Sequence, residues 1–125
     1  MTEEDLTNKL ITGEVVKNHK GTFYFIEPGN WIDRHGYPIQ KKLHREDGPA
    51  LEEADGSKFW YLNGKLHRED GPAVEYPDGS KSWCLNGIRH REDGPAIEHP
   101  DGTKEWWLNG KEFTEKEFNQ RVKSK

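Results

Sequence analysis

Residues 67–89 read HREDGPAVEYPDGSKSWCLNGIR and form the middle one of three consecutive 23-residue copies. The first copy spans residues 44–66, and the third spans residues 90–112. Fifteen of the 23 positions hold the same residue in all three copies. Repetition at a short fixed period is typical of linear arrays, in which each unit packs on its neighbours. The sequence therefore predicts an array rather than a globule with one thick core.

Each copy contains two turn signals. In the middle copy, Pro77-Asp78-Gly79 has the order of a type I turn closed by a Gly bulge, with Gly where φ must be positive. Asn86-Gly87 has the composition of the tighter type I′ turn. The glycine of the first turn recurs in every copy, as Gly56, Gly79 and Gly102.

The three-residue Pro-Asp-Gly loop predicts the register of the strands around it. Counting outward places Tyr76 opposite Ser80, and opposite charges or large and small side chains then face each other, as cross-strand pairing favours. The predicted pairs are Glu52–Lys58, Glu75–Lys81, Glu98–Lys104, Ala50–Trp60, Ala73–Trp83 and Ala96–Trp106.

The stretch between Asn-Gly and the next Asp-Gly allows two interpretations. In one, residues 66–68 form a short third strand that places His67 beside Trp60 and His90 beside Trp83. In the other, residues 63–71 form a long turn between hairpins. Three antiparallel strands per copy would reverse the direction of each successive copy. We therefore favour two strands per copy.

The flanking segments predict caps for the array. Residues 21–43 look like a degenerate copy, and residues 1–20 form an N-terminal cap segment with a helix expected over residues 3–11. In residues 113–125, Thr114 and Glu117 have capping-box spacing, and Phe113, Phe118 and Val122 share one helical face. The prediction is an all-β, single-layer antiparallel meander of 23-residue hairpin repeats with a C-terminal capping helix. Its unpaired sheet edges are either covered by the charged termini or paired in a homo-oligomer.

Composition limits the classes of partner. Hydrophobic residues make up 30% of the chain and charged residues 34%, which suits a thin, wet sheet. The net charge is −4 with both signs interspersed, so we expect no nucleic-acid duplex as a partner. No apolar run reaches the roughly 20 residues of a membrane helix, and we expect no membrane partner. The single cysteine, Cys84, and an acidic N-terminus unlike a secretion signal favour a cytoplasmic location.

The wording DGSKFWYLNGKLHREDG of residues 55–71 resembles MORN-type repeats, especially bacterial variants with a DG-x-aromatic-NGK-x-G rhythm. The resemblance covers residues 43–111 and implies successive β-hairpins in an elongated, curved antiparallel sheet. The chain differs in carrying HREDGPA where the family usually has a short Gly-centred turn. Repeats with this wording are also similar to small uncharacterised proteins of bacteriophages and large viruses. That similarity implies a viral protein in the cytoplasm of a bacterial host and no particular activity.

Positions that differ between the copies predict a binding surface. By period-2 alternation they fall on the face opposite Trp60, Trp83 and Trp106. We expect Tyr61, Tyr76, His99 and Trp107 to contribute to this surface, with Phe59 and Glu105 at neighbouring variable positions. Leu51, Val74 and Ile97 share the face and stay aliphatic, which indicates that part of it is core. The alternative is that these aromatic side chains pack against the terminal helices.

The repeated His and Arg residues are interpreted first as structural residues. Equivalent His residues two strands apart lie about 9.6 Å from each other, so one zinc ion cannot bind His44, His67 and His90 together. We therefore expect no metal and no cofactor. Arg45, Arg68 and Arg91 either pair with nearby carboxylates or form a ladder that binds a phosphate or carboxylate ligand.

Three classes of function are open at this point. The favoured class is a non-catalytic binding protein, a small viral inhibitor that occupies a host protein such as a component of an antiviral defence system. The second is a sponge that sequesters a small anionic nucleotide signal through Arg and aromatic side chains. The third is an enzyme acting through His and Asp, although no nucleophile recurs beside them.

Overall fold

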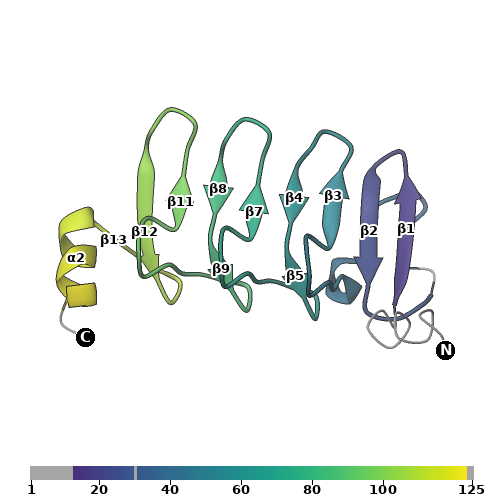
Figure 1. Cartoon of the computed structure of the whole chain (residues 1–125), viewed down its shortest axis with the longest axis horizontal. Helices are drawn as coiled ribbons and strands as arrows, with labels where there is room; N and C mark the ends of the chain where they lie inside the picture. Colours follow the sequence, from purple (N-terminus) through teal and green to yellow (C-terminus); the bar gives the residue numbers. More distant parts are fainter. Residues whose placement is uncertain (1–12, 30, 124–125) are drawn as a thin grey trace.

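The computed structural model describes residues 13–29 and 31–123 as a row of β-hairpins that ends in a helix (Figure 1). The helix predicted over residues 3–11 lies outside the described residues. The elements in chain order are β1 (Glu14–Asn18), β2 (Gly21–Phe25), the 3-10 helix η1 (Gln40–Lys42), β3 (Leu51–Glu53), β4 (Lys58–Phe59), β5 (Tyr61–Leu62), β6 (Lys65–Leu66), β7 (Val74–Glu75), β8 (Lys81–Ser82), β9 (Cys84–Leu85), β10 (Ile88–Arg89), β11 (Ile97–Glu98), β12 (Lys104–Leu108), β13 (Lys111–Phe113) and α2 (Glu115–Lys123).

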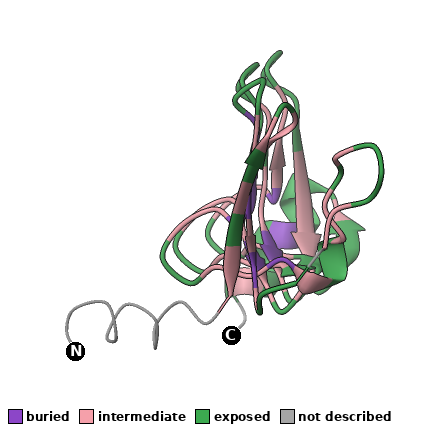
Figure 2. Ribbon diagram, turned by 90° about the vertical axis from the view of Figure 1, so that its right-hand side faces the viewer, coloured by how far each residue is buried: buried purple, intermediate pink, exposed green. Residues whose placement is uncertain are grey.

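Nine of these strands form one open antiparallel sheet in the order β1-β2-β3-β4-β7-β8-β11-β12-β13. Each 23-residue copy contributes one hairpin to this sheet, and β4 and β8 pair with the first strand of the next copy. Figure 1 shows these hairpins side by side along the long axis of the molecule. Viewed along that axis, the hairpin tips are exposed and the buried residues gather below them (Figure 2). The all-β meander of hairpins with a C-terminal helix is thus confirmed.

The register predicted for the charged pairs is confirmed. Glu75 lies opposite Lys81, and the equivalent Glu–Lys pairs of the first and third copies also face each other. The Tyr76 N–H donates to the Ser80 carbonyl at 3.0 Å, and Gly79 has the positive φ of 96° that its turn requires. The loop between the strands therefore has the Gly bulge conformation that its sequence predicts.

The predicted Ala–Trp pairs are wrong, because each hairpin carries an additional bulge. Val74 lies opposite Ser82, yet the N–H of Ala73 also donates to the Ser82 carbonyl, at 2.8 Å. Two residues thus face one, which is a β-bulge, and the same arrangement recurs in the other two copies. Beyond it, the Trp83 N–H donates at 2.7 Å to Ala96 of the following copy. The tryptophan backbone therefore ties neighbouring copies together.

The Asn-Gly turns close a second, smaller hairpin in each copy. Asn86 and Gly87 both have positive φ, at 51° and 80°, as a type I′ turn requires. The strands β5-β6 and β9-β10 each form a two-stranded sheet of their own, outside the nine-stranded sheet. Two strands of each of the first two copies therefore enter the large sheet, as favoured, whereas in the third copy β13 joins the sheet as well. The rejected interpretation was right in one respect, because the His67 N–H does bond to the Trp60 carbonyl, at 2.9 Å.

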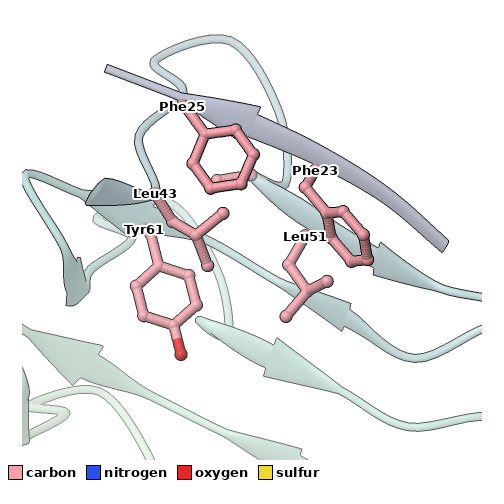
Figure 3. Close-up of a cluster of buried hydrophobic side chains, with 6 residues drawn as sticks. Phe23, Phe25, Leu43, Leu51 and Tyr61 are labelled. Atoms are coloured by element: carbon pink, nitrogen blue, oxygen red, sulfur yellow. The ribbon is translucent and has the colours of Figure 1, made fainter. Parts of the chain in front are cut away.

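The hydrophobic core lies toward the N-terminal end of the array (Figure 3). Its side chains come from the degenerate copy and the first full copy, namely Phe23, Phe25, Leu43, Ala50, Leu51 and Tyr61. The hairpin of β1 and β2 crosses the boundary expected between residues 20 and 21. The first hairpin therefore forms one end of the sheet and supplies Phe23 and Phe25 to the core.

Helix α2 closes the other end of the sheet. Its capping box is formed as predicted: the Glu117 N–H donates to Thr114 Oγ1 at 3.1 Å, and the Thr114 N–H donates to Glu117 Oε1 at 2.9 Å. Phe118 is only 3% exposed, and its ring centroid lies 6.4 Å from that of Trp106. The helix therefore covers the tryptophan of the last copy.

Candidate binding surface

The two faces of the sheet differ in how far their side chains are exposed. We call the side that carries Trp60, Trp83 and Trp106 the tryptophan face, and the side that carries Phe59, Tyr61 and their equivalents the variable face. Tyr61 is 7% exposed and Cys84 is 6% exposed, whereas the repeated tryptophans are half-buried. The variable face is thus the more buried of the two along the first copies. This burial agrees with the aliphatic Leu51 and Val74 of the same face, and it contradicts only the expected contribution of Tyr61 to a binding surface.

Tyr61 belongs to the core and does not contribute to a surface (Figure 3). Burial raises the pKa of its phenol above the ordinary value. Phe59 packs on the same core, and its ring meets that of Tyr76 edge-on at 5.8 Å. Tyr76 itself is 46% exposed. Of these three predicted binding residues, Tyr76 alone presents a large exposed surface.

On the tryptophan face, each repeated arginine is held by the array itself. The Arg68 guanidinium lies 3.9 Å from the centroid of the Trp60 ring. Its Nε donates to Asp70 at 3.0 Å, and its Nη1 donates to the Pro72 carbonyl at 3.0 Å and to Glu75 at 3.2 Å. Arg91 repeats this arrangement on Trp83, and Arg45 stacks on Tyr24 of the degenerate copy. The predicted pairing of arginines with carboxylates is therefore observed.

Each repeated histidine braces the end of its own copy. Nδ1 of His67 accepts the Asn86 N–H at 2.9 Å, and the same bond joins His44 to Asn63 and His90 to Asn109. Because Nδ1 accepts, the neutral ring carries its proton on Nε2, which lies 3.3 Å from Glu69. Across residues 13–29 and 31–123, no three His, Cys, Asp or Glu side chains are grouped as ligands for a metal ion.

The third copy brings together three of the predicted binding residues. Glu105 Oε2 lies 2.9 Å from His99 Nε2, and Glu105 Oε1 accepts the Trp107 indole N–H at 3.1 Å. The bond with His99 and then the one with Trp107 lower the pKa of Glu105 below its ordinary value. His99 keeps 40% of its side chain exposed. The result is a half-exposed polar cluster on a face that is mostly apolar in the first copy.

Sequence reasoning missed Arg89, whose guanidinium lies 5.0 Å from the Trp107 ring centroid. The signal was present, because this position varies as the others do, reading Leu66, Arg89 and Glu112 in successive copies. The register places Leu66 opposite Tyr61 and Arg89 opposite Cys84, on the variable face. We call Arg89, His99, Glu105 and Trp107, together with the exposed Tyr76 of the middle copy on the same face, the C-terminal patch.

The variable face thus changes character along the array. In the first copy its variable side chains are the apolar Phe59, Tyr61 and Leu66, which pack into or against the core. In the third copy the equivalents are Glu105, Trp107 and Glu112, and none of them is buried. Burial of the variable side chains decreases toward the C-terminal end of the array, where the C-terminal patch lies.

No family model, curated protein or solved structure matches this chain. The resemblance to MORN-type repeats therefore depends on the repeated motif alone. In the described part of the chain, no helix is both long enough and apolar enough to cross a bilayer.

Proposed function

We propose that the chain is a non-catalytic binding protein that holds a partner protein on its C-terminal patch. One observation carries this proposal. The repeated Arg, Asp and His side chains are engaged in bonds that build the array, whereas the variable side chains of the third copy lie together, half-exposed, at one end of one face. Residues that hold the copies together need to be the same in each copy. Residues that contact a partner need to differ.

The composition of the patch supports a protein partner. Trp, Tyr and Arg carry a disproportionate share of binding energy in protein interfaces, and the patch contains one of each. Glu105 fixes the Trp107 indole and contacts His99, so these side chains lose little rotamer freedom when a partner arrives. An open sheet face of this kind suits the broad surface of another protein.

The nucleotide sponge receives less support. It needs guanidinium groups that are available to an anion, yet Arg45, Arg68 and Arg91 each pair with carboxylates and have side chains only 20–25% exposed. An enzymatic role also receives less support, because Nδ1 of each repeated histidine accepts a backbone N–H and is not open to a substrate.

The HREDGPA motif is similar to repeats of small phage proteins, and we therefore propose that the partner is a protein of a bacterial host. The chain acts in the cytoplasm of a bacterial host as an inhibitor that occupies a host protein, for example a component of an antiviral defence system.

Affinity capture from bacterial lysate tests the proposal, with a patch variant and a matched control. Tyr76→Ala combined with Trp107→Ala removes one exposed and one half-buried ring from the patch, whereas Tyr37→Ala removes a ring that is 50% exposed in the degenerate copy. We expect one stoichiometric host protein with the wild type and with Tyr37→Ala, and its loss with the patch variant. Capture that is equal for all three proteins, or absent for all, would contradict the proposal.

A further inference from the structure

The tryptophan face contains a groove of about 410 Å³ between the HRED segments of the first two copies. Trp60 and Leu62 line it, together with Glu46 from one segment and Glu69 and Asp70 from the next. The groove thus combines apolar side chains from the sheet with carboxylates from the flanking loops. It lies on the face opposite the C-terminal patch.

The charge of the groove is negative. The two arginines that line it are outnumbered, because Arg45 pairs with Asp47 and Glu52, and Arg68 pairs with Asp70 and Glu75. Glu46 and Glu69 add two more carboxylates, and each keeps 82% of its side chain exposed. A cationic group with an apolar stem matches this combination, since the stem of Lys or Arg packs on apolar side chains while its charge stays at the surface.

The residues of the groove recur one copy further along. Glu69, Trp83, Leu85 and Asp93 stand at the equivalent positions, and Arg91 lies on Trp83 at the same 3.9 Å that separates Arg68 from Trp60. Each copy adds two strands to the sheet, so equivalent positions are about 9.6 Å apart. The residues that form the negative groove therefore recur at a fixed spacing along the face.

We propose that the tryptophan face binds an extended basic peptide in the polyproline II conformation, with Lys or Arg at every third residue. Polyproline II has three residues per turn and rises about 9.3 Å per turn, so such side chains point the same way at nearly the spacing of the grooves. A β-strand places same-face side chains about 6.8 or 13.6 Å apart, and an α-helix places residues i and i+7 about 10.5 Å apart. Both match less well.

Titration with synthetic peptides tests this inference, followed by calorimetry and intrinsic tryptophan fluorescence. The probe is a twelve-residue peptide of Lys-Pro-Pro units, and its control has the same composition with its lysines in adjacent pairs. We expect the periodic peptide to bind about tenfold more tightly than its control, and more weakly at 300 mM than at 50 mM NaCl. Glu46→Gln combined with Glu69→Gln is expected to weaken it about tenfold.

The matched control variant is Glu112→Gln combined with Glu115→Gln, which removes the same charge elsewhere on the surface, where both residues are exposed. It is expected to bind the periodic peptide as the wild type does. The inference would be overturned if the control peptide, spermine or a helical lysine peptide bound with the same affinity as the periodic peptide. So would the absence of binding, or an unchanged affinity in the groove variant with a wild-type melting temperature. Because Glu46 and Glu69 are exposed, that variant is expected to fold.

Discussion

At the residue scale, the repeated arginine contacts both its own copy and the preceding one. Arg68 stacks on a ring of the preceding copy and bonds to Asp70, Pro72 and Glu75 of its own copy. A guanidinium has donors in a rigid plane that satisfies these partners together and stacks on an aromatic ring, whereas an ammonium is a compact charge that cannot do both. The identity of this residue in every copy therefore follows from its geometry.

Replacing Arg68 with Lys is expected to lower the free energy of unfolding by about 1–2 kcal/mol, because the stack and at least one charge-assisted hydrogen bond are lost. Urea denaturation measures this. The exposed Arg34→Lys serves as the control and is expected to change stability by less than about 0.5 kcal/mol. A loss no larger for Arg68→Lys than for Arg34→Lys would show that the guanidinium contacts do not stabilise the array.

The aspartates of the hairpin turns predict how stability depends on pH. The Ser80 N–H donates to Asp78 Oδ1 at 2.8 Å, and hydrogen bonds from the backbone and side chain of Ser57, Ser80 and Thr103 hold the pKa values of Asp55, Asp78 and Asp101 below their ordinary 3.8. A folded-state pKa below the unfolded one means that the stabilisation is complete above pH 3.8. It is lost as the pH falls from there through the folded values.

Urea midpoints at pH 6, 4 and 3 check this expectation. The wild type is expected to lose stability chiefly below pH 4, and the triple variant Asp55→Ala, Asp78→Ala and Asp101→Ala is expected to lose less over the same interval. Burial raises the pKa of Glu53 and gives that residue the opposite pH dependence, but it is a single group. Equal losses in wild type and triple variant would assign the acid sensitivity to other groups.

At the element scale, the turns were the part of the fold that the sequence predicted best. Gly79 and Asn86 need φ values that few residues adopt, so their positions fixed the hairpins and the Glu75–Lys81 pairing. The second bulge at Ala73 was not predictable, because alanine carries no marker of it and a shift by one residue satisfies the same hydrogen-bonding groups. This bulge moved Trp83 from its own hairpin to the next copy.

A different cause explains the incomplete prediction of the binding surface. The period-2 alternation correctly predicted that Trp60 and Tyr61 lie on opposite faces of the sheet. It did not indicate which face would be covered, because burial depends on Phe23 and Leu43 of the degenerate copy, whose packing no repeat pattern describes. The sequence predicted that His99, Glu105 and Trp107 contribute to one surface, but it did not predict the hydrogen bonds that join them.

Helix α2 takes the place that the next copy would occupy. Phe118 lies on Trp106, where Arg68 and Arg91 lie on the tryptophans of the earlier copies. Phe118→Ala is therefore expected to release the helix and to cost about 3 kcal/mol. Hydrogen exchange is expected to lose protection in β12, β13 and α2 while β1 and β2 keep theirs, since repeat arrays open locally.

The exposed Lys116→Ala on the same helix is the control and should leave exchange unchanged. If Phe118→Ala exposes β1 and β2 to exchange as strongly as β12, the sheet unfolds as one unit, and α2 is more than a terminal cap.

At the scale of the whole molecule, the two faces of the open sheet differ in the contacts that they make. Contacts on the tryptophan face repeat from copy to copy and hold the hairpins together, while the variable face changes from a buried apolar surface to a half-exposed polar one. In the function that we propose, the partner protein contacts a surface made by one copy and its neighbour. Substitutions in that copy are expected to alter binding without altering the array.

The most direct test gives the third copy the variable residues of the second, through His99→Tyr, Glu105→Ser and Trp107→Cys. The tryptophan face, the turns and the histidine braces keep their residues in this variant. We predict an unchanged far-ultraviolet circular dichroism spectrum, a melting temperature within about 5 °C of wild type, and loss of the host protein captured by the wild type. Capture at wild-type stoichiometry by this folded variant would contradict the assignment of the binding surface to the C-terminal patch.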